Sequence, residues 1–71
     1  MALRNERLAF IGCGAMAEAM VKGLLVQELV SPEQIVASNP REERVQELVD
    51  RYAIRATTSN REAASGASIV N

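Results

Sequence analysis

Three small residues near the start of the sequence have a spacing that suits the binding of phosphate. Gly12, Gly14 and Ala17 form the pattern G-x-G-x-x-A within "FIGCGAMAEAM". The first glycine permits a tight turn, the second lets backbone approach a pyrophosphate, and the alanine lets the following helix lie close to a sheet. The N–H groups and dipole at the start of such a helix favour an anion. The stretch therefore predicts a dinucleotide site, the alternative being that the glycines only form a compact turn.

A second polar stretch bears on which dinucleotide is bound. NAD-binding proteins usually place an acidic residue on the ribose hydroxyls, about 20 residues beyond the glycines. This chain has Ser38 and Asn39 there, followed by Arg41 and Arg44. Hydroxyl, amide and guanidinium groups can bind the 2′-phosphate of NADP, which a carboxylate would repel. NADP(H) is therefore favoured over NAD(H). The alternative is that Asn39 only caps the next helix and the arginines are only solvated.

Few other residues of the chain could do chemistry. Cys13 lies where the start of a helix could lower the pKa of a thiol, but the sequence has no histidine to activate it. We interpret Cys13 as a small side chain that fills space, and Met16 and Met20 as core residues. One cysteine without histidine excludes a disulfide framework and the usual zinc spacings. No metal site is predicted.

The composition is that of an ordinary globular protein. The 71 residues are 48% hydrophobic and 24% charged, with a net charge of −1, which argues against a disordered chain. So small a charge creates no field that would attract nucleic acid or an anionic membrane. No stretch approaches the ~18 apolar residues of a membrane span. We expect a cytoplasmic protein in a reducing compartment, with no nucleic-acid or membrane partner.

The elements that would position these residues alternate along the chain. Short apolar stretches bounded by turn residues predict strands, and apolar periodicity with capping signals predicts helices. Asn39 is expected to cap the second helix with Pro40 at its first position, and Ser59 and Glu62 to form a capping box before a third helix that ends near Gly66. The expected strands are 7–11, 34–38, 53–57 and one that begins at 67, and the first two helices are 15–30 and 40–52.

This alternation predicts an α/β fold with a Rossmann-like parallel sheet, in the strand order 3-2-1-4, flanked by helices and truncated after the fourth strand. The glycine turn would lie at the carboxyl edge of the first strand, where open α/β sheets bind ligands. A further element is expected to complete the cover of the sheet. We therefore interpret residues 1–71 as the N-terminal part of a dinucleotide-binding domain.

Three stretches together resemble one enzyme family over residues 7–71. "IGCGAMAEAMVKGLL", "ASNPREER" and "TTSNREAASGASIV" are similar to the N-terminal cofactor domain of pyrroline-5-carboxylate reductase. The resemblance implies NAD(P)H-dependent reduction of a cyclic imine, 1-pyrroline-5-carboxylate, to L-proline in proline biosynthesis. It also implies a homo-oligomer whose helical C-terminal domain, with the dimer contacts and the imine pocket, is absent from these 71 residues. The cofactor-binding residues implied are Ile11, Gly12, Cys13, Gly14, Ala15 and Met16 beside the pyrophosphate and nicotinamide, Ser38, Asn39 and Arg41 facing the 2′-phosphate, and Asn60 near the adenine ribose.

Because the imine pocket is absent, no catalytic residue is predicted, and we expect the 71 residues alone to be inactive. Three other interpretations stay open. One is the N-terminal part of a β-hydroxyacid-dehydrogenase-like NADP enzyme, whose glycine turn is similar but which often has Asn-Arg where this chain has Asn39, Pro40 and Arg41. The second is a non-catalytic NADP-binding fragment, and the third is an excised piece with no function of its own.

Overall fold

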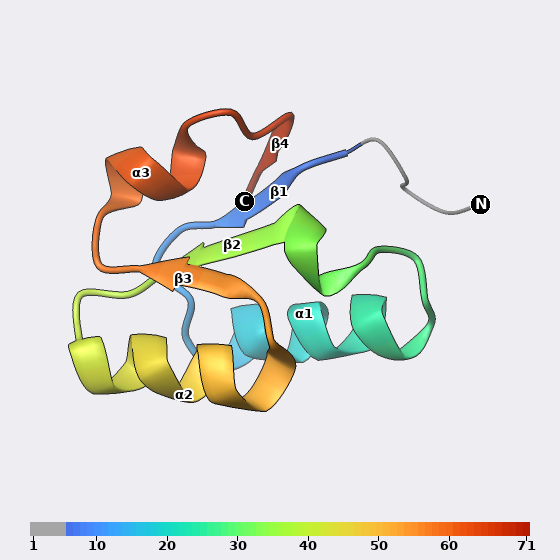
Figure 1. Ribbon diagram of the computed structural model, residues 1–71, viewed down its shortest axis with the longest axis horizontal. Helices are drawn as coiled ribbons and strands as arrows, with labels where there is room; N and C mark the ends of the chain where they lie inside the picture. Colours follow the sequence, from blue (N-terminus) through green and yellow to red (C-terminus); the bar gives the residue numbers. More distant parts are fainter. Residues whose placement is uncertain (1–5) are drawn as a thin grey trace.

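A four-stranded parallel sheet forms the centre of the computed structural model, which describes residues 6–71 (Figure 1). The strand order is β3-β2-β1-β4, and each neighbouring pair is parallel. The predicted Rossmann-like fold and strand order are therefore confirmed. In chain order the elements are β1 (Leu8–Phe10), α1 (Ala15–Val26), the 3-10 helix η1 (Pro32–Gln34), β2 (Ile35–Ser38), α2 (Glu42–Tyr52), β3 (Arg55–Thr57), α3 (Asn60–Ala64) and β4 (Ile69–Val70).

Helices cover both faces of the sheet. Helices α1 and α2 lie on one face, and α3 lies on the other (Figure 1). This arrangement follows from the right-handed crossover of parallel strands. The connections from β1 to β2 and from β2 to β3 run in one direction across the sheet, whereas the connection from β3 to β4 runs back the other way. The carboxyl ends of the strands therefore meet at one edge, where the glycine turn begins.

The core lies between the central strands and the helices. All three residues of β1 are buried, and β2 contributes Ile35 and Ala37. Val21 of α1 and Leu48 of α2 are fully buried on one side of the sheet, and Ala63 of α3 on the other. Burying such side chains is the main favourable contribution to folding. Helix α2 thus reaches the core through Leu48.

Two helix boundaries differ from the predicted ones. Helix α1 ends at Val26, because Glu28 has a positive φ of 57° and the chain then turns into η1. Helix α2 begins at Glu42 rather than Pro40, so the prediction that Asn39 caps it is wrong. Arg41 occupies the N-cap, and its side chain makes no capping hydrogen bond. The Asn39 side chain accepts the N–H of Arg41 and donates to the Cys13 carbonyl.

One of the two hydrogen bonds of the capping box predicted for the third helix is confirmed. The Ser59 hydroxyl accepts the backbone N–H of Glu62 at 3.1 Å, as expected of an N-cap. The reciprocal contact to the N–H of Ser59 comes from the Thr57 hydroxyl, and the Glu62 carboxylate accepts from that same hydroxyl. The third strand is also shorter than predicted, because Ala53 ends α2 in a left-handed conformation.

The prediction that Met16 and Met20 are core residues is wrong. Met16 is 86% exposed and Met20 is 50% exposed. The face of α1 that meets the core runs instead through Ala17, Val21 and Leu24, which are neighbours one helical turn apart. The two methionines lie beside this face, and Met20 accepts a weak bond from the Asn71 side chain.

A group of polar side chains joins α1 to α2. The Glu18 carboxylate of α1 accepts hydrogen bonds from Arg44, from Arg51 at 2.6 Å and from the Tyr52 hydroxyl at 2.5 Å, all on α2. These bonds, from Tyr52 first and then from Arg44, lower the pKa of Glu18 to about 2. The same contact raises the pKa of the Tyr52 hydroxyl. We call Glu18, Arg44, Arg51 and Tyr52 the helix-pair cluster.

None of the helices within residues 6–71 is long and apolar enough to span a bilayer.

The helix-pair cluster predicts a pH dependence of stability. Because the folded pKa of Glu18 lies below its usual value of 4.5, its contribution is complete above about pH 4.5 and is lost as the pH falls toward 2. Glu18→Gln should lower the free energy of unfolding by about 1–3 kcal/mol at pH 7. Urea unfolding at pH 7, 4 and 2.5 should show this difference shrinking with acid. A constant difference across that range would contradict the assignment.

Candidate functional site

The glycine turn leaves its backbone open at the carboxyl end of β1. Gly12 has a φ of +68°, a left-handed conformation that side chains rarely adopt, so the predicted need for glycine at the turn is confirmed. Gly14 is the N-cap of α1, and no heavy atom lies within 4 Å of where a Cβ would stand on either glycine. A helix also leaves its first N–H groups without intrahelical acceptors. The turn and the start of α1 thus present open space and unpaired donors, which fits a pyrophosphate.

Hydrogen bonds fasten this turn to the end of β2. The N–H of Gly12 donates to Ser38 Oγ at 3.1 Å, and the N–H of Cys13 donates to the Ser38 carbonyl at 2.6 Å. The Asn39 side-chain amide donates to the Cys13 carbonyl at 2.9 Å. We call these three bonds the turn clamp. These bonds hold the backbone of the turn without using the first N–H groups of α1, which have no acceptor within the helix.

Ser38 is the buried centre of this arrangement. Its side chain is fully buried, and its hydroxyl accepts from Gly12 while donating to Asn60 Oδ1 at 2.6 Å. The sequence placed Ser38 facing a 2′-phosphate, but a buried hydroxyl with both of these bonds made is not turned to solvent. The structure does bring Ser38 and Asn60 together, although they are 22 residues apart. Ser38 connects the glycine turn to the start of α3.

The two arginines after β2 point to different places. The Arg41 side chain is 74% exposed and pairs with Glu43 at 3.0 Å. Arg44 is 21% exposed and belongs to the helix-pair cluster. Arg41 is also next to the turn clamp, since its N–H donates to the Asn39 side chain at 3.0 Å. Of the two, Arg41 is the guanidinium with room to reach an added phosphate.

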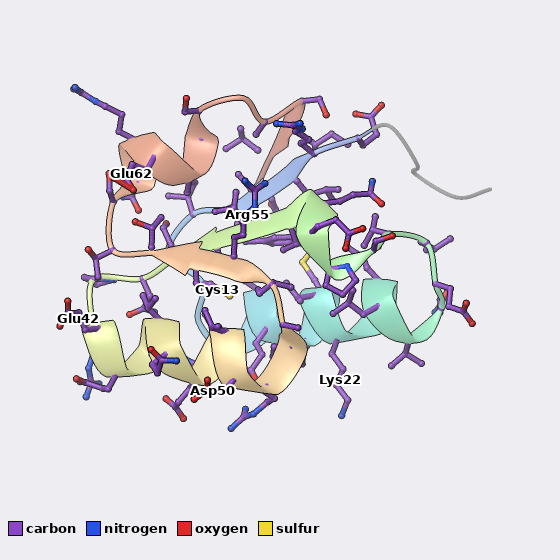
Figure 2. The ribbon with its side chains drawn as sticks, in the orientation of Figure 1. Cys13, Lys22, Glu42, Asp50, Arg55 and Glu62 are labelled. Atoms are coloured by element: carbon purple, nitrogen blue, oxygen red, sulfur yellow. The ribbon has the colours of Figure 1, made fainter. Side chains whose placement is uncertain are left out.

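Cys13 lies inside the protein. Its side chain is fully buried in the core, between the sheet and the helices below it (Figure 2). Burial raises the pKa of the Cys13 thiol, and the nearby guanidinium of Arg44 lowers it less. A raised pKa leaves less thiolate, so the side chain is poorly suited to nucleophilic chemistry. The interpretation of Cys13 as a space-filling residue is confirmed, and its backbone alone is part of the turn.

The remaining predicted residues flank the turn. Ala15 and Met16 are exposed at the start of α1, and Ile11 is half-buried, with its N–H bonded to the Asn71 carbonyl at 2.8 Å. Asn60 is exposed at the first position of α3. The predicted residues therefore gather at one edge of the sheet. Arg44, considered beside them from the sequence, turns away.

Two surface hollows lie away from the turn. One, of about 760 Å³, is lined by the second half of α1 and the loop that follows, together with Arg51 and Tyr52. The other, of about 490 Å³, lies along β3 beside Glu62. Neither is lined by residues 11–17; the first includes Ser31 and Pro32 at the start of η1, and the second includes Glu62 in the first turn of α3. The candidate site is placed at the glycine turn on the open space beside Gly12 and Gly14 and on the first N–H groups of α1. Among residues 6–71, no three acidic or cysteine side chains are grouped so as to hold a metal ion.

Sequence reasoning missed two features of this site. It assigned Ser38 and Asn39 to the ligand and the helix cap, whereas both hold the turn. The available signal was that polar residues at the end of one parallel strand lie beside the turn that follows the neighbouring strand. It also missed the hydrogen bonds that Glu18 accepts from three residues of α2, which are 26 to 34 positions away in the sequence.

Known proteins are similar to this chain over most of its length. Residues 7–70 match the family described as NADP oxidoreductase, coenzyme F420-dependent. Among its curated relatives are several that carry the name pyrroline-5-carboxylate reductase. That of Corynebacterium melassecola is 44% identical over 63 residues, covering 89% of this chain and 23% of its own length. That of Escherichia coli K12 is 37% identical over 66 residues, which cover 93% of this chain and 24% of the relative. That of Pseudomonas aeruginosa is 41% identical over 68 residues, which cover 96% of this chain and 24% of the relative. The chain thus spans about a quarter of the length of these relatives.

The two glycines of the turn should respond differently to substitution. Gly12→Ala forces a side chain into a left-handed conformation and should lower the free energy of unfolding by roughly 1–2 kcal/mol. Gly14→Ala meets open space at a φ of −99° and should leave stability nearly unchanged. Urea unfolding of both variants measures this, and equal losses at the two positions would contradict the described turn.

Proposed function

Because this chain belongs to the family of NADP oxidoreductases described as coenzyme F420-dependent, we propose that it is the cofactor-binding part of a pyrroline-5-carboxylate reductase. The names of the relatives support this reaction and favour it over the β-hydroxyacid dehydrogenase alternative. The reaction is the NADP-dependent reduction of the C=N bond of 1-pyrroline-5-carboxylate to L-proline. The bound cofactor would supply the hydride, and this chain would hold and orient the cofactor.

The observation that carries the proposal is the open glycine turn at the start of α1. Gly12 and Gly14 leave space for a pyrophosphate, and the first N–H groups of α1 supply its donors. Ala15 and Met16 are exposed on the same turn of helix and are proposed to border the nicotinamide side, with Ile11. Residues 12–15 carry no large or acidic side chain, and the Glu18 carboxylate further along the first turn of α1 is paired with Arg44 and Arg51. A dianionic pyrophosphate therefore meets no unpaired negative charge here.

The end of β2 supports NADP(H) over NAD(H). No carboxylate stands at this position to accept the ribose hydroxyls of NAD, since Ser38 is followed by Asn39. Arg41 is exposed and is proposed to bind the 2′-phosphate by a charge-assisted bond. Asn60 is proposed to approach the adenine ribose. Ser38 is proposed to act on the cofactor through the turn that it holds, because its own hydroxyl is buried.

The imine substrate needs groups beyond those that this chain offers. Orienting two reactants is a large part of catalysis, and no imine pocket or proton donor is identified among residues 6–71. We propose that the whole enzyme is a cytoplasmic homo-oligomer in which another domain supplies that pocket. The 71 residues alone should therefore show no reductase activity. Formation of proline from the imine and NADPH by the purified chain would refute this part of the proposal.

Two substitutions separate recognition of the 2′-phosphate from support of the turn. Arg41→Ala should weaken NADPH binding about fivefold and leave NADH binding unchanged, because only NADPH carries the phosphate. Ser38→Ala should weaken both cofactors alike, because it removes the acceptor of the Gly12 N–H. Titration of each variant with NADPH and NADH, followed by fluorescence, measures the dissociation constants.

Salt provides a control for the same experiment. The loss in Arg41→Ala should shrink as ionic strength rises, since an exposed guanidinium is screened. The loss in Ser38→Ala should not change. Equal weakening of NADPH and NADH by Arg41→Ala would contradict the assigned role of Arg41, and a loss specific to NADPH in Ser38→Ala would return Ser38 to the phosphate.

A further inference from the structure

The helix-pair cluster joins the two helices whose first turns flank the proposed cofactor site. Glu18 lies in the first turn of α1, three residues after the helix begins at Ala15. Its carboxylate bonds to Arg44 near the start of α2 and to Arg51 and Tyr52 in its last turn. One side chain of α1 is thus bonded to both ends of α2. Rotation or sliding of α1 against α2 would break at least one of these bonds.

The geometry makes Arg44 the connection to the 2′-phosphate side. The carbonyl of Arg41, at the N-cap of α2, accepts the N–H of Arg44 at 3.1 Å. Fixing the Arg44 side chain on Glu18 therefore fixes the helical turn that carries Arg41. The distance between the first N–H groups of α1 and the helical turn that carries Arg41 is then held constant. A dinucleotide that spans both places gains from this, because its binding does not have to fix the two helices first.

The cluster also neutralises a charge that would oppose binding. A carboxylate in the first turn of α1 is near the end of the helix where phosphate is expected and would repel it. The Glu18 side chain is only 14% exposed, and two guanidinium groups contact its two oxygens. Lys22, one turn further along α1, extends away into solvent (Figure 2) and leaves the carboxylate to α2. The negative charge is thus paired within the protein.

From this geometry we propose that Glu18 is a positioning residue of the cofactor site. It sets the first turn of α1 relative to the first turn of α2, and so raises the affinity for NADPH without touching it. The inference rests on the proposed function and adds to it a residue that is not among the cofactor-binding residues implied by the glycine pattern or by the resemblance. Its partners Arg44, Arg51 and Tyr52 act through it.

Glu47 provides a matched control. It is also a glutamate that lies within 3.9 Å of both Arg44 and Arg51, but all three are on α2. Glu47→Ala removes the same charge near the same arginines and leaves the link to α1 intact. A general effect of charge would therefore appear in both variants. An effect of helix position would appear only in Glu18→Ala.

The test compares these two variants of the 71-residue chain for binding of NADPH and NADH. Glu18→Ala should weaken NADPH about fivefold and NADH less, since NADH lacks the phosphate that reaches Arg41. Glu47→Ala should bind both cofactors as the unchanged chain does. A role confined to stability would lower the unfolding midpoint of Glu18→Ala and leave the two affinities of the folded protein unchanged, which would overturn the inference.

Other outcomes are also decisive. Tighter NADPH binding by Glu18→Ala would show that the freed arginines attract the phosphates and would overturn the inference. If Glu18→Ala does not fold, Tyr52→Phe, which removes one hydrogen bond to Glu18, takes its place. It should weaken NADPH binding more than NADH binding, by less than fivefold, and unchanged affinities for both cofactors would overturn the inference. Failure of the unchanged chain to bind NADPH would instead refute the proposed function, and the inference with it.

Discussion

The site depends on the bonds that hold the glycine turn to the end of β2. A turn with Gly12 at positive φ is flexible by nature, because the residue that permits it also has the most backbone freedom to lose. The turn clamp removes that freedom with acceptors and donors from Ser38 and Asn39. Because Ser38 ends β2 and Asn39 follows it directly, the position of the turn is set by the pairing of β1 with β2 in the sheet. The first N–H groups of α1, which have no acceptor within the helix, are left for a ligand.

The sheet and the helices bring the remaining residues of the site together. The parallel order β3-β2-β1-β4 brings the turn, Asn39 and Asn60 to one edge, although they come from three different connections. Ser38 reaches Asn60 across that edge. On the face below, the helix-pair cluster keeps α1 and α2 together through charge and hydrogen bonds, in addition to the apolar contacts of Val21 and Leu48. A nucleotide would meet one assembled edge rather than separate loops.

Much of this could be predicted from the sequence, because local patterns determine it. The glycine spacing, the apolar strands and the signal at Ser59 depend on residues within a few positions of one another, and they predicted the fold and the turn correctly. What failed was the direction of individual side chains. Met16 and Met20 have helical spacing, but the sheet contacts the neighbouring stripe through Ala17 and Val21. Asn39 is a residue type that often caps helices, but its side-chain amide donates a hydrogen bond to the Cys13 carbonyl instead.

The bonds that Ser38 and Glu18 make depend on chain segments at least 22 residues away, so no local pattern could reveal them. The most direct test of the account follows the backbone N–H signals of the ¹⁵N-labelled chain by NMR while NADPH is added. We expect the largest shifts at residues 12–17, with a further shift at Arg41 that is smaller with NADH. Absence of any shift, or shifts centred on the hollow lined by Lys22, Leu25 and Pro32, would contradict a dinucleotide site at the glycine turn.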